Sequence, residues 1–332
     1  MDTRLMALLL AAAALFAPAA QAQIMNVWLD VDPAAGLPDA DVDDALALIQ
    51  AFHSPELRVR GVSVVYGNAP LADGLPIARE VVEKFGPAGL GVYAGAAGPD
   101  ALGTACDSTD AMAEAFKGMP MTLLALGPLT NVGSFLKLHP GLHDRIAHIV
   151  VVAGRRPGQR ITPNPALEAN FRDFNFENDP EAMRIILESK VPLVMAPWEV
   201  SSHVWVTAAD IESLRGKSAA GTWIAEHSQL WLGLWRDSFE RDGFNPFDTL
   251  AIGWATHPKQ IKILPVTVSI QPGPDDTREP DGPPAEKPYL LVDPDNRAGR
   301  AATYCYLPDE SFKPMLLERL AGPPQAGGAP GQ

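Results

Sequence analysis

Short apolar runs alternate with amphipathic stretches along most of this chain. Runs rich in β-branched and other apolar residues predict strands at 27–29, 57–66, 121–126, 146–153 and 191–196. Apolar residues at helical spacing predict helices at 76–85, 131–138 and 180–189, the last with Asp179 as N-cap and Pro180 in its first turn. This alternation is typical of an α/β fold: an open, mostly parallel central sheet flanked by helices, with a Rossmann-like core.

The second half of the chain has a less regular pattern. A Pro- and Asn-rich segment predicts a loop at 155–172, and the apolar spacing predicts helix across 208–235. Two late strands are expected at 261–270 and 289–292. Between these strands, an acidic, Pro-rich segment predicts a loop at 271–287.

The two ends of the chain differ from the middle. Arg4 precedes an apolar stretch that is too short for a typical transmembrane helix, and an Ala-Gln-Ala cleavage site follows it. We therefore expect a signal peptide at 1–22, a mature chain that begins near Gln23, and a periplasmic or secreted protein. No internal repeat divides residues 23–320, which predicts a single domain. The Gly-, Pro- and Ala-rich segment 321–332 predicts a disordered tail.

Composition and charge narrow the possible partners. The chain has 332 residues, 47% of them hydrophobic, which is an ordinary globular composition. Its net charge of −14 argues against binding to nucleic acid or to an anionic membrane. No later segment is long and apolar enough to suggest a membrane span. Cys106 and Cys305 could form a disulfide in an exported protein or remain free thiols, and the sequence leaves both possibilities open.

Acidic residues gather where the first predicted strand ends. Asp30 and Asp32 close that strand, and Asp43 and Asp44 begin an Ala- and Leu-rich segment, where a helix dipole favours carboxylates. Ligands of open α/β sheets bind at the carboxyl ends of the strands. Clustered carboxylates repel one another unless a cation lies between them, and their hard oxygens favour Ca²⁺ or Mg²⁺. The alternative is that these acids only cap a helix and fill a polar loop.

Five motifs in order make the sequence resemble the inosine-uridine-preferring nucleoside hydrolases. They are Asp30-x-Asp32-Pro33 with Asp43-Asp44-Ala45-Leu46, Tyr66-Gly67-Asn68, Leu126-Gly127-Pro128-Leu129-Thr130-Asn131, Asp173-Phe174-Asn175 with Asp179-Pro180-Glu181-Ala182, and Phe247-Asp248. The resemblance spans roughly residues 26–310. It implies the nucleoside hydrolase fold and a single catalytic domain that cleaves the N-glycosidic bond of ribonucleosides and releases base and ribose.

The resemblance also implies a role for each matching position. It implies that Ca²⁺ is bound by the carboxylates of Asp32, Asp44 and Asp248 and by the carbonyl of Leu126. Asp32 would be the general base that activates a calcium-bound water. The sugar would be hydrogen-bonded by Asp43, Asn68, Asp173 and Asn175. Asp30 is expected to orient its neighbours. This chemistry suits an oxocarbenium-like transition state, which surrounding carboxylates stabilise.

Three departures from the family pattern affect the expected site. Residues 34–41 resemble an insertion between the acidic pairs, so Asp39 or Asp41 could enter the metal site. Asp173 is one methylene shorter than the Glu usual at its position. Phe247 replaces a His that is associated with protonating the leaving base, and Phe cannot donate a proton.

Two tryptophans on one helix face could contact the base. Trp231 and Trp235 are spaced i, i+4 and could stack on a nucleobase, or could pack in the core instead.

Two other kinds of protein remain as alternatives. A phosphohydrolase of the haloacid-dehalogenase type also has Asp-x-Asp after its first strand, although Pro33-Ala34 fits that pattern poorly. A non-catalytic periplasmic nucleoside-binding protein could retain the fold, and Phe247 leaves that open. Members of the resembled family are often homo-oligomers, so a homo-oligomer is possible by analogy.

Overall fold

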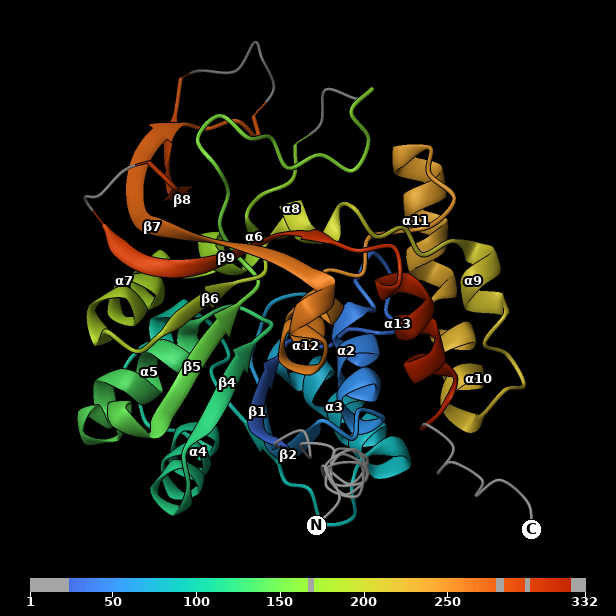
Figure 1. Ribbon diagram of the computed structural model, residues 1–332, viewed down its shortest axis with the longest axis horizontal. Helices are drawn as coiled ribbons and strands as arrows, with labels where there is room; N and C mark the ends of the chain where they lie inside the picture. Colours follow the sequence, from blue (N-terminus) through green and yellow to red (C-terminus); the bar gives the residue numbers. More distant parts are fainter. Residues whose placement is uncertain (1–23, 167–169, 279–283, 296–298, 324–332) are drawn as a thin grey trace, which may run out of the picture.

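A computed structural model of the chain describes residues 24–166, 170–278, 284–295 and 299–323. Its centre is a nine-stranded sheet with the strand order β3-β2-β1-β4-β5-β6-β9-β7-β8 (Figure 1). The strands from β3 through β9 in this order run parallel, while β7 pairs antiparallel with both β9 and β8. The predicted open, mostly parallel α/β fold is therefore confirmed.

The elements of the sheet and its helical layers have the following bounds. The strands are β1 Met25–Val31, β2 Leu57–Val64, β3 Val92–Ala94, β4 Met121–Ala125, β5 Ile146–Val151, β6 Leu193–Met195, β7 Ile261–Pro274, β8 Glu286–Asp293 and β9 Arg300–Pro308. The helices are α2 Asp43–Phe52, α3 Leu71–Phe85, α4 Asp107–Gly118, α5 Thr130–Leu138, α6 Phe174–Asn178, α7 Pro180–Ser189, α8 Trp198–Ser201, α9 Ala208–Glu212, α10 Ala219–His227, α11 Gln229–Phe239, α12 Thr249–Thr256 and α13 Phe312–Ala321.

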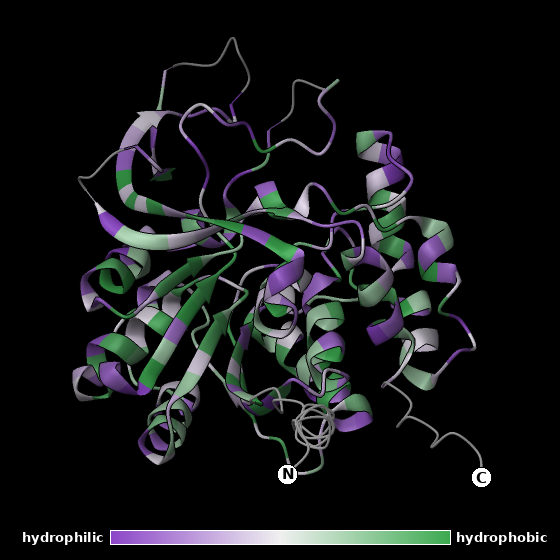
Figure 2. Ribbon diagram, in the orientation of Figure 1, coloured by the Kyte–Doolittle hydropathy of each residue, from purple (hydrophilic) through white to green (hydrophobic). Residues whose placement is uncertain are grey.

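Each face of the sheet has its own hydrophobic core. Alternate residues of a strand point to opposite faces, so Val27, Leu29 and Val31 of β1 join one core and Trp28 joins the other. The first core is covered by α2, α3 and α10 to α13, and the second by α4, α5 and α7. Figure 2 shows hydrophobic residues concentrated on the central strands and polar residues on outward helix surfaces.

The strand order places a binding crevice beside β1. The chain moves from β1 to β2 and β3 on one side, then returns to β4 and β5 on the other. The loops that follow β1 and β4 therefore leave the sheet in opposite directions, which opens a crevice at the carboxyl ends of these strands. This is the end of the sheet at which the predicted acidic residues lie.

Several element boundaries differ from the sequence prediction. Helix α3 begins at Leu71, so Pro76 lies inside the helix and not at its start. The stretch predicted as helix across 208–235 forms three helices, and within it Ser218 caps the start of α10. The acidic loop expected at 271–287 is shorter, since β7 continues to Pro274 and β8 begins at Glu286.

Other predicted features agree with the structure or lie beyond it. The side chain of Asp179 accepts a hydrogen bond from the Ala182 N–H and caps α7 as expected. Cys106 and Cys305 are free thiols. No helix among the described residues is long and apolar enough to cross a membrane. The predicted signal peptide and most of the predicted tail lie outside the described residues, although Ala321 belongs to α13.

Candidate active site

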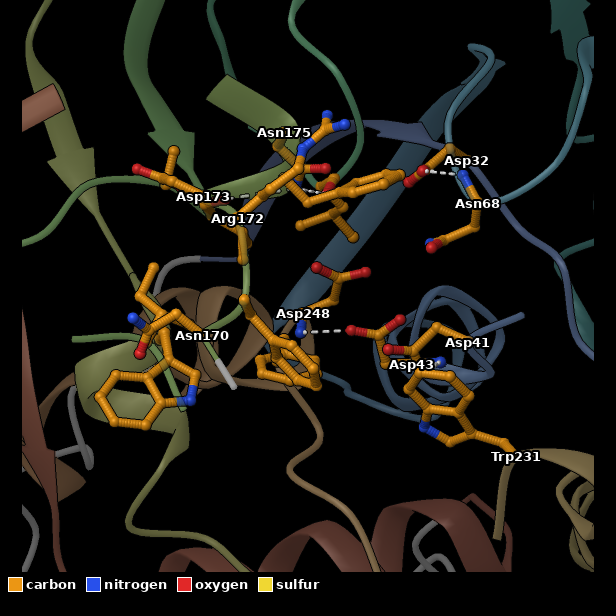
Figure 3. A pocket seen from close by; sticks show the side chains of 18 of the residues that line it. Asp32, Asp41, Asp43, Asn68, Asn170, Arg172, Asp173, Asn175, Trp231 and Asp248 are labelled. Carbon is orange, nitrogen blue, oxygen red and sulfur yellow. Dashed lines mark hydrogen bonds between the residues drawn. The ribbon is translucent and has the colours of Figure 1, made fainter. Parts of the chain in front are cut away.

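The acidic site is built from segments that meet at the carboxyl ends of the central strands. Asp32 follows β1, Asn68 lies in the loop after β2, and Leu126 follows β4. The first turn of α2 begins with Asp43 and Asp44, and Asp248 directly precedes α12. Figure 3 shows side chains from these segments pointing into one cavity.

The cavity is large enough for a nucleoside-sized ligand. Its volume is about 570 Å³, within the range of small-molecule pockets. Its described lining residues are Asp32, Asp39, Asp41, Asp43, Asn68, Leu126, Val152, Ala153, Ile161, Asn170, Phe171, Arg172, Asp173, Phe174, Asn175, Trp198, Trp231, Leu234, Phe239, Phe247, Asp248 and Thr277. Acidic side chains gather toward the strand ends, and aromatic side chains form much of the remaining wall.

The carboxylate of Asp32 is held tightly against the backbone. Its Oδ2 accepts a hydrogen bond from the Asn68 N–H at 2.7 Å, and its own N–H donates to Asp44 Oδ1 at 3.0 Å. A Cβ on Gly67 would lie 1.9 Å from Asp32 Oδ2, and one on Gly127 would lie 2.7 Å from Asp32 Oδ1. Both positions must therefore be glycine, which explains the Gly in two of the sequence motifs.

Three buried carboxylates form a site for a cation. Asp43, Asp44 and Asp248 each offer an oxygen within 4.8 Å of the others, and the Asp248 N–H donates to Asp43 Oδ2 at 3.3 Å. No ion pair of the described residues involves any of the three. Uncompensated buried carboxylates of this kind fit a hard divalent cation. Asp32 adjoins this group, and the charge of Asp44 acts directly on it.

The pKa values reflect burial and mutual repulsion. Burial raises the pKa of Asp43 to about 6, and burial together with the charge of Asp43 raises the pKa of Asp44 to about 8. The same two causes, burial first and neighbouring aspartates second, raise the pKa of Asp32 and of Asp248 well above the usual value. A bound cation would reverse these shifts because it favours the charged forms.

A second group of polar side chains lies across the cavity. Asp173 Oδ2 accepts a hydrogen bond from the Gly154 N–H at 2.8 Å, and burial raises the pKa of Asp173 to about 7. Asn175 Nδ2 donates to the carbonyls of Leu126 and Val152. The Leu126 carbonyl, expected as a metal ligand, is thus engaged by Asn175 in this structure.

A buried ionic network supports the segment that carries Asp173 and Asn175. Arg155, whose side chain is 2% exposed, pairs with Asp276 at 2.7 Å and with Glu177 at 3.4 Å. Lys287 pairs with Glu177 and with Asp276, at 2.9 Å each. The network joins α6 to the β7–β8 hairpin and so fixes one wall of the cavity. No local pattern predicts this network, since its members come from distant segments.

The two tryptophans of α11 have different places: Trp231 can still stack on a nucleobase, whereas Trp235 takes the alternative place in the core. Trp231 lines the cavity, as does Phe247. Trp235 is fully buried and does not line it: its ring packs edge-on against Trp231, Trp205 and Phe239. Because the helix turns 100° per residue, the i, i+4 pair shares a face only loosely, and here its members divide between cavity and core.

Several cavity residues were not expected from the sequence. Phe171, Arg172 and Asn170 come from a segment interpreted only as a loop, and Thr277 comes from the hairpin region. Trp198, by contrast, comes after the strand predicted at 191–196, and that place predicts that it lines the crevice, as it does. Asp30 is fully buried outside the cavity and accepts hydrogen bonds from Ser63 and Asn131, so it orients neighbours as expected.

The segment 34–41 enters the cavity as an added wall. Both Asp39 and Asp41 line it, and Asp41 Oδ1 accepts hydrogen bonds from the Val42 and Asp43 N–H groups. A Cβ on Gly36 would lie 2.9 Å from a ring atom of His227, so the segment packs against the end of α10. The cluster of Asp43, Asp44 and Asp248 that could hold a cation does not include Asp39 or Asp41.

Comparison with known proteins identifies the family of the chain that carries this site. The family model of the inosine-uridine preferring nucleoside hydrolases matches residues 27–293. The chain belongs to this family. Its members are ribonucleoside hydrolases, enzymes that cleave N-glycosidic bonds, so the haloacid-dehalogenase alternative is wrong and a non-catalytic binding protein finds no support. The acidic cluster is one that could hold the metal ion on which the family depends.

Individual relatives agree with this assignment. The pyrimidine-specific ribonucleoside hydrolase RihA of Salmonella typhimurium is 31% identical over 278 residues, covering 74% of this chain and 84% of the relative. A plant nucleoside hydrolase, PpNRh1, superimposes with a TM-score of 0.74 at 21% identity, covering 90% of this chain and all of its own. A purine-preferring ribonucleoside hydrolase from Gardnerella vaginalis gives 0.71 at 20% identity, with coverage of 89% and 98%.

Proposed function

We propose that this protein is an exported, calcium-dependent ribonucleoside hydrolase in which Asp32 activates the attacking water. The observation that carries the proposal is the convergence of four buried carboxylates at the strand ends beside β1. A cation would relieve the repulsion within such a group, and a cation next to Asp32 suits hydrolysis. The short apolar N-terminal segment supports export to the periplasm or beyond.

The chain's own residues divide the work between binding and proton transfer. Asp43, Asn68, Asp173 and Asn175 line the cavity and present polar groups to a sugar. Asp32 accepts the proton of a water that attacks C1′, and its fixed carboxylate is oriented for this by the Asn68 N–H. The carboxylates around the cavity stabilise the positive charge that develops on the ribosyl ring.

Calcium fits the acidic cluster better than a softer metal. Asp43, Asp44 and Asp248 offer only oxygen ligands, which suit Ca²⁺ or Mg²⁺. When bound, such an ion would lower the pKa of water and orient the ribose hydroxyls. Asp32 could join the ligand set from its place beside the cluster. The Leu126 carbonyl could also join it if Asn175 released that carbonyl.

Release of ribose and free base from nucleosides tests this function. We expect purified protein to produce both in equal amounts, and Asp32→Asn to lower kcat by at least about 10²-fold, the usual scale of base catalysis. Asp237→Asn is the matched control, because it makes the same change on a side chain that is 70% exposed. Near-parent turnover in Asp32→Asn would show that Asp32 is not the base.

A further inference from the structure

Apart from aspartates such as Asp173, the cavity offers little that could protonate a departing base. Among its described lining residues there is no histidine, lysine, tyrosine or cysteine. The titratable lining groups are aspartates and Arg172, whose guanidinium stacks on Phe174 and donates to Asn178. At the position directly before Asp248, Phe247 supplies an apolar ring. A neutral nucleobase leaves poorly from such a site, since it must gain a proton or depart as an anion.

The same wall is well suited to a positive charge. Trp198, Trp231 and Phe247 contribute aromatic rings, and the faces of such rings attract cations. The indole N–H groups of Trp198 and Trp231 are buried without a hydrogen-bond partner. These two side chains therefore offer the cavity ring surface and not a hydrogen-bond donor.

Acidic side chains line the same cavity as these aromatic rings. The segment 34–41 packs on His227 at the end of α10, and Trp231 lies one helical turn further along the chain. This segment brings Asp39 and Asp41 into the cavity, and none of the described ion pairs involves them. Figure 3 shows Asp41 and Trp231 on the same side of the cavity. A cavity that is lined by both aromatic rings and carboxylates favours a cationic group.

We propose that the preferred substrates are ribosides whose base carries a positive charge, of the N-ribosylpyridinium or N7-alkylpurine type. The inference rests on the proposed hydrolase function and names the substrate class of that site. Water oxygen bonds to C1′ as the C1′–N bond breaks, and the electron pair goes to the ring nitrogen. The base leaves neutral, the water's proton passes to Asp32, and no acid is required.

Three ribosides separate this inference from the function on which it rests. 7-Methylguanosine has a cationic base, guanosine is its neutral counterpart, and 4-nitrophenyl riboside is neutral but needs no acid. We expect kcat/KM for 7-methylguanosine to exceed that for guanosine by about 10²-fold or more. We also expect 4-nitrophenyl riboside to be cleaved.

A variant of Asp39 distinguishes recognition of the positive charge on the base from the ease with which that base leaves. Asp39 has a φ of 55°, which Asn tolerates well, so Asp39→Asn removes a charge without straining the backbone. We expect Asp39→Asn to lower kcat/KM for 7-methylguanosine by about 5- to 10-fold more than it lowers kcat/KM for 4-nitrophenyl riboside. Trp231→Leu should reduce both, and the cationic substrate more.

The outcomes are distinct. If guanosine is cleaved within about 10-fold of 7-methylguanosine, a working acid such as Asp41 exists and the inference is wrong. It is also wrong if 4-nitrophenyl riboside is cleaved but 7-methylguanosine is not, or if Asp39→Asn affects both substrates equally; the hydrolase function then stands. If none of the three is hydrolysed, the proposed function itself fails, and the inference with it.

Discussion

Replacing Asp44 with Asn should stabilise the metal-free protein and reduce the stabilisation that a bound metal gives. Asp44 Oδ1 accepts a hydrogen bond from the Asp32 N–H, and the amide oxygen of Asn preserves that bond. The folded chain raises the pKa of Asp44 from 3.8 to about 8. Because the folded state binds this proton more tightly than the unfolded state, metal-free stability falls as pH rises from about 4 to about 8.

The size of the effect follows from that shift. An assay at about pH 7 lies roughly three pH units above the unfolded-state pKa of Asp44. At 1.36 kcal/mol per unit, the metal-free protein loses at most about 4 kcal/mol of its free energy of unfolding over that interval. We therefore expect Asp44→Asn to be more stable than the parent in chelator, by about 2–4 kcal/mol. Calcium at about 100 times its dissociation constant would add about 2.7 kcal/mol to the parent. The variant loses a ligand and should gain much less.

Urea unfolding followed by tryptophan fluorescence measures both effects. The two proteins are compared at about pH 7 in chelator and then in saturating calcium. We expect the variant to have the higher midpoint in chelator and the parent to gain more from calcium. A variant that is less stable than the parent in chelator would refute the claim that these carboxylates repel one another.

Three further predictions concern the missing acid, the buried ionic network and export. Phe247→His should raise kcat/KM for inosine by about 10-fold if an acid is missing, and an unchanged value would show otherwise. Arg155→Met should lower the free energy of unfolding by about 2 kcal/mol, because Glu177 and Asp276 lose one cationic partner and keep Lys287, and a loss below about 1 kcal/mol would argue against the network. Mass spectrometry of the exported protein should find a mature chain that begins near Gln23, and a retained Arg4 would contradict export by cleavage.

Local patterns predicted most of the sheet and the acidic residues after its first strand, whereas Asn68 and Leu126 were expected from the family resemblance. Strand β1 and the helix that follows Asp43-Asp44 are encoded by neighbouring residues, so their positions could be inferred directly. The Asp179 cap is likewise a local signal. The βα alternation then brought Asp32, Asn68 and Leu126 to one edge, because parallel strands end on the same side of a sheet.

Features that depend on long-range packing could not be inferred in this way. Trp231 and Trp235 have the same spacing signal, and only the position of α11 decides which ring reaches the cavity. Arg155 and Lys287 are 132 positions apart in the chain and meet at Glu177. Strand β9 enters the sheet between β6 and β7, out of sequence order, which no local pattern indicates.

Metal dependence of ribose release is the most direct test of the account. Protein stripped with a chelator is assayed with a cleavable riboside, and calcium is then returned in measured amounts. We predict that activity is lost on stripping and restored at one calcium ion per chain, and that Asp248→Asn needs a much higher calcium concentration. Full turnover by protein shown by elemental analysis to be metal-free would contradict the account.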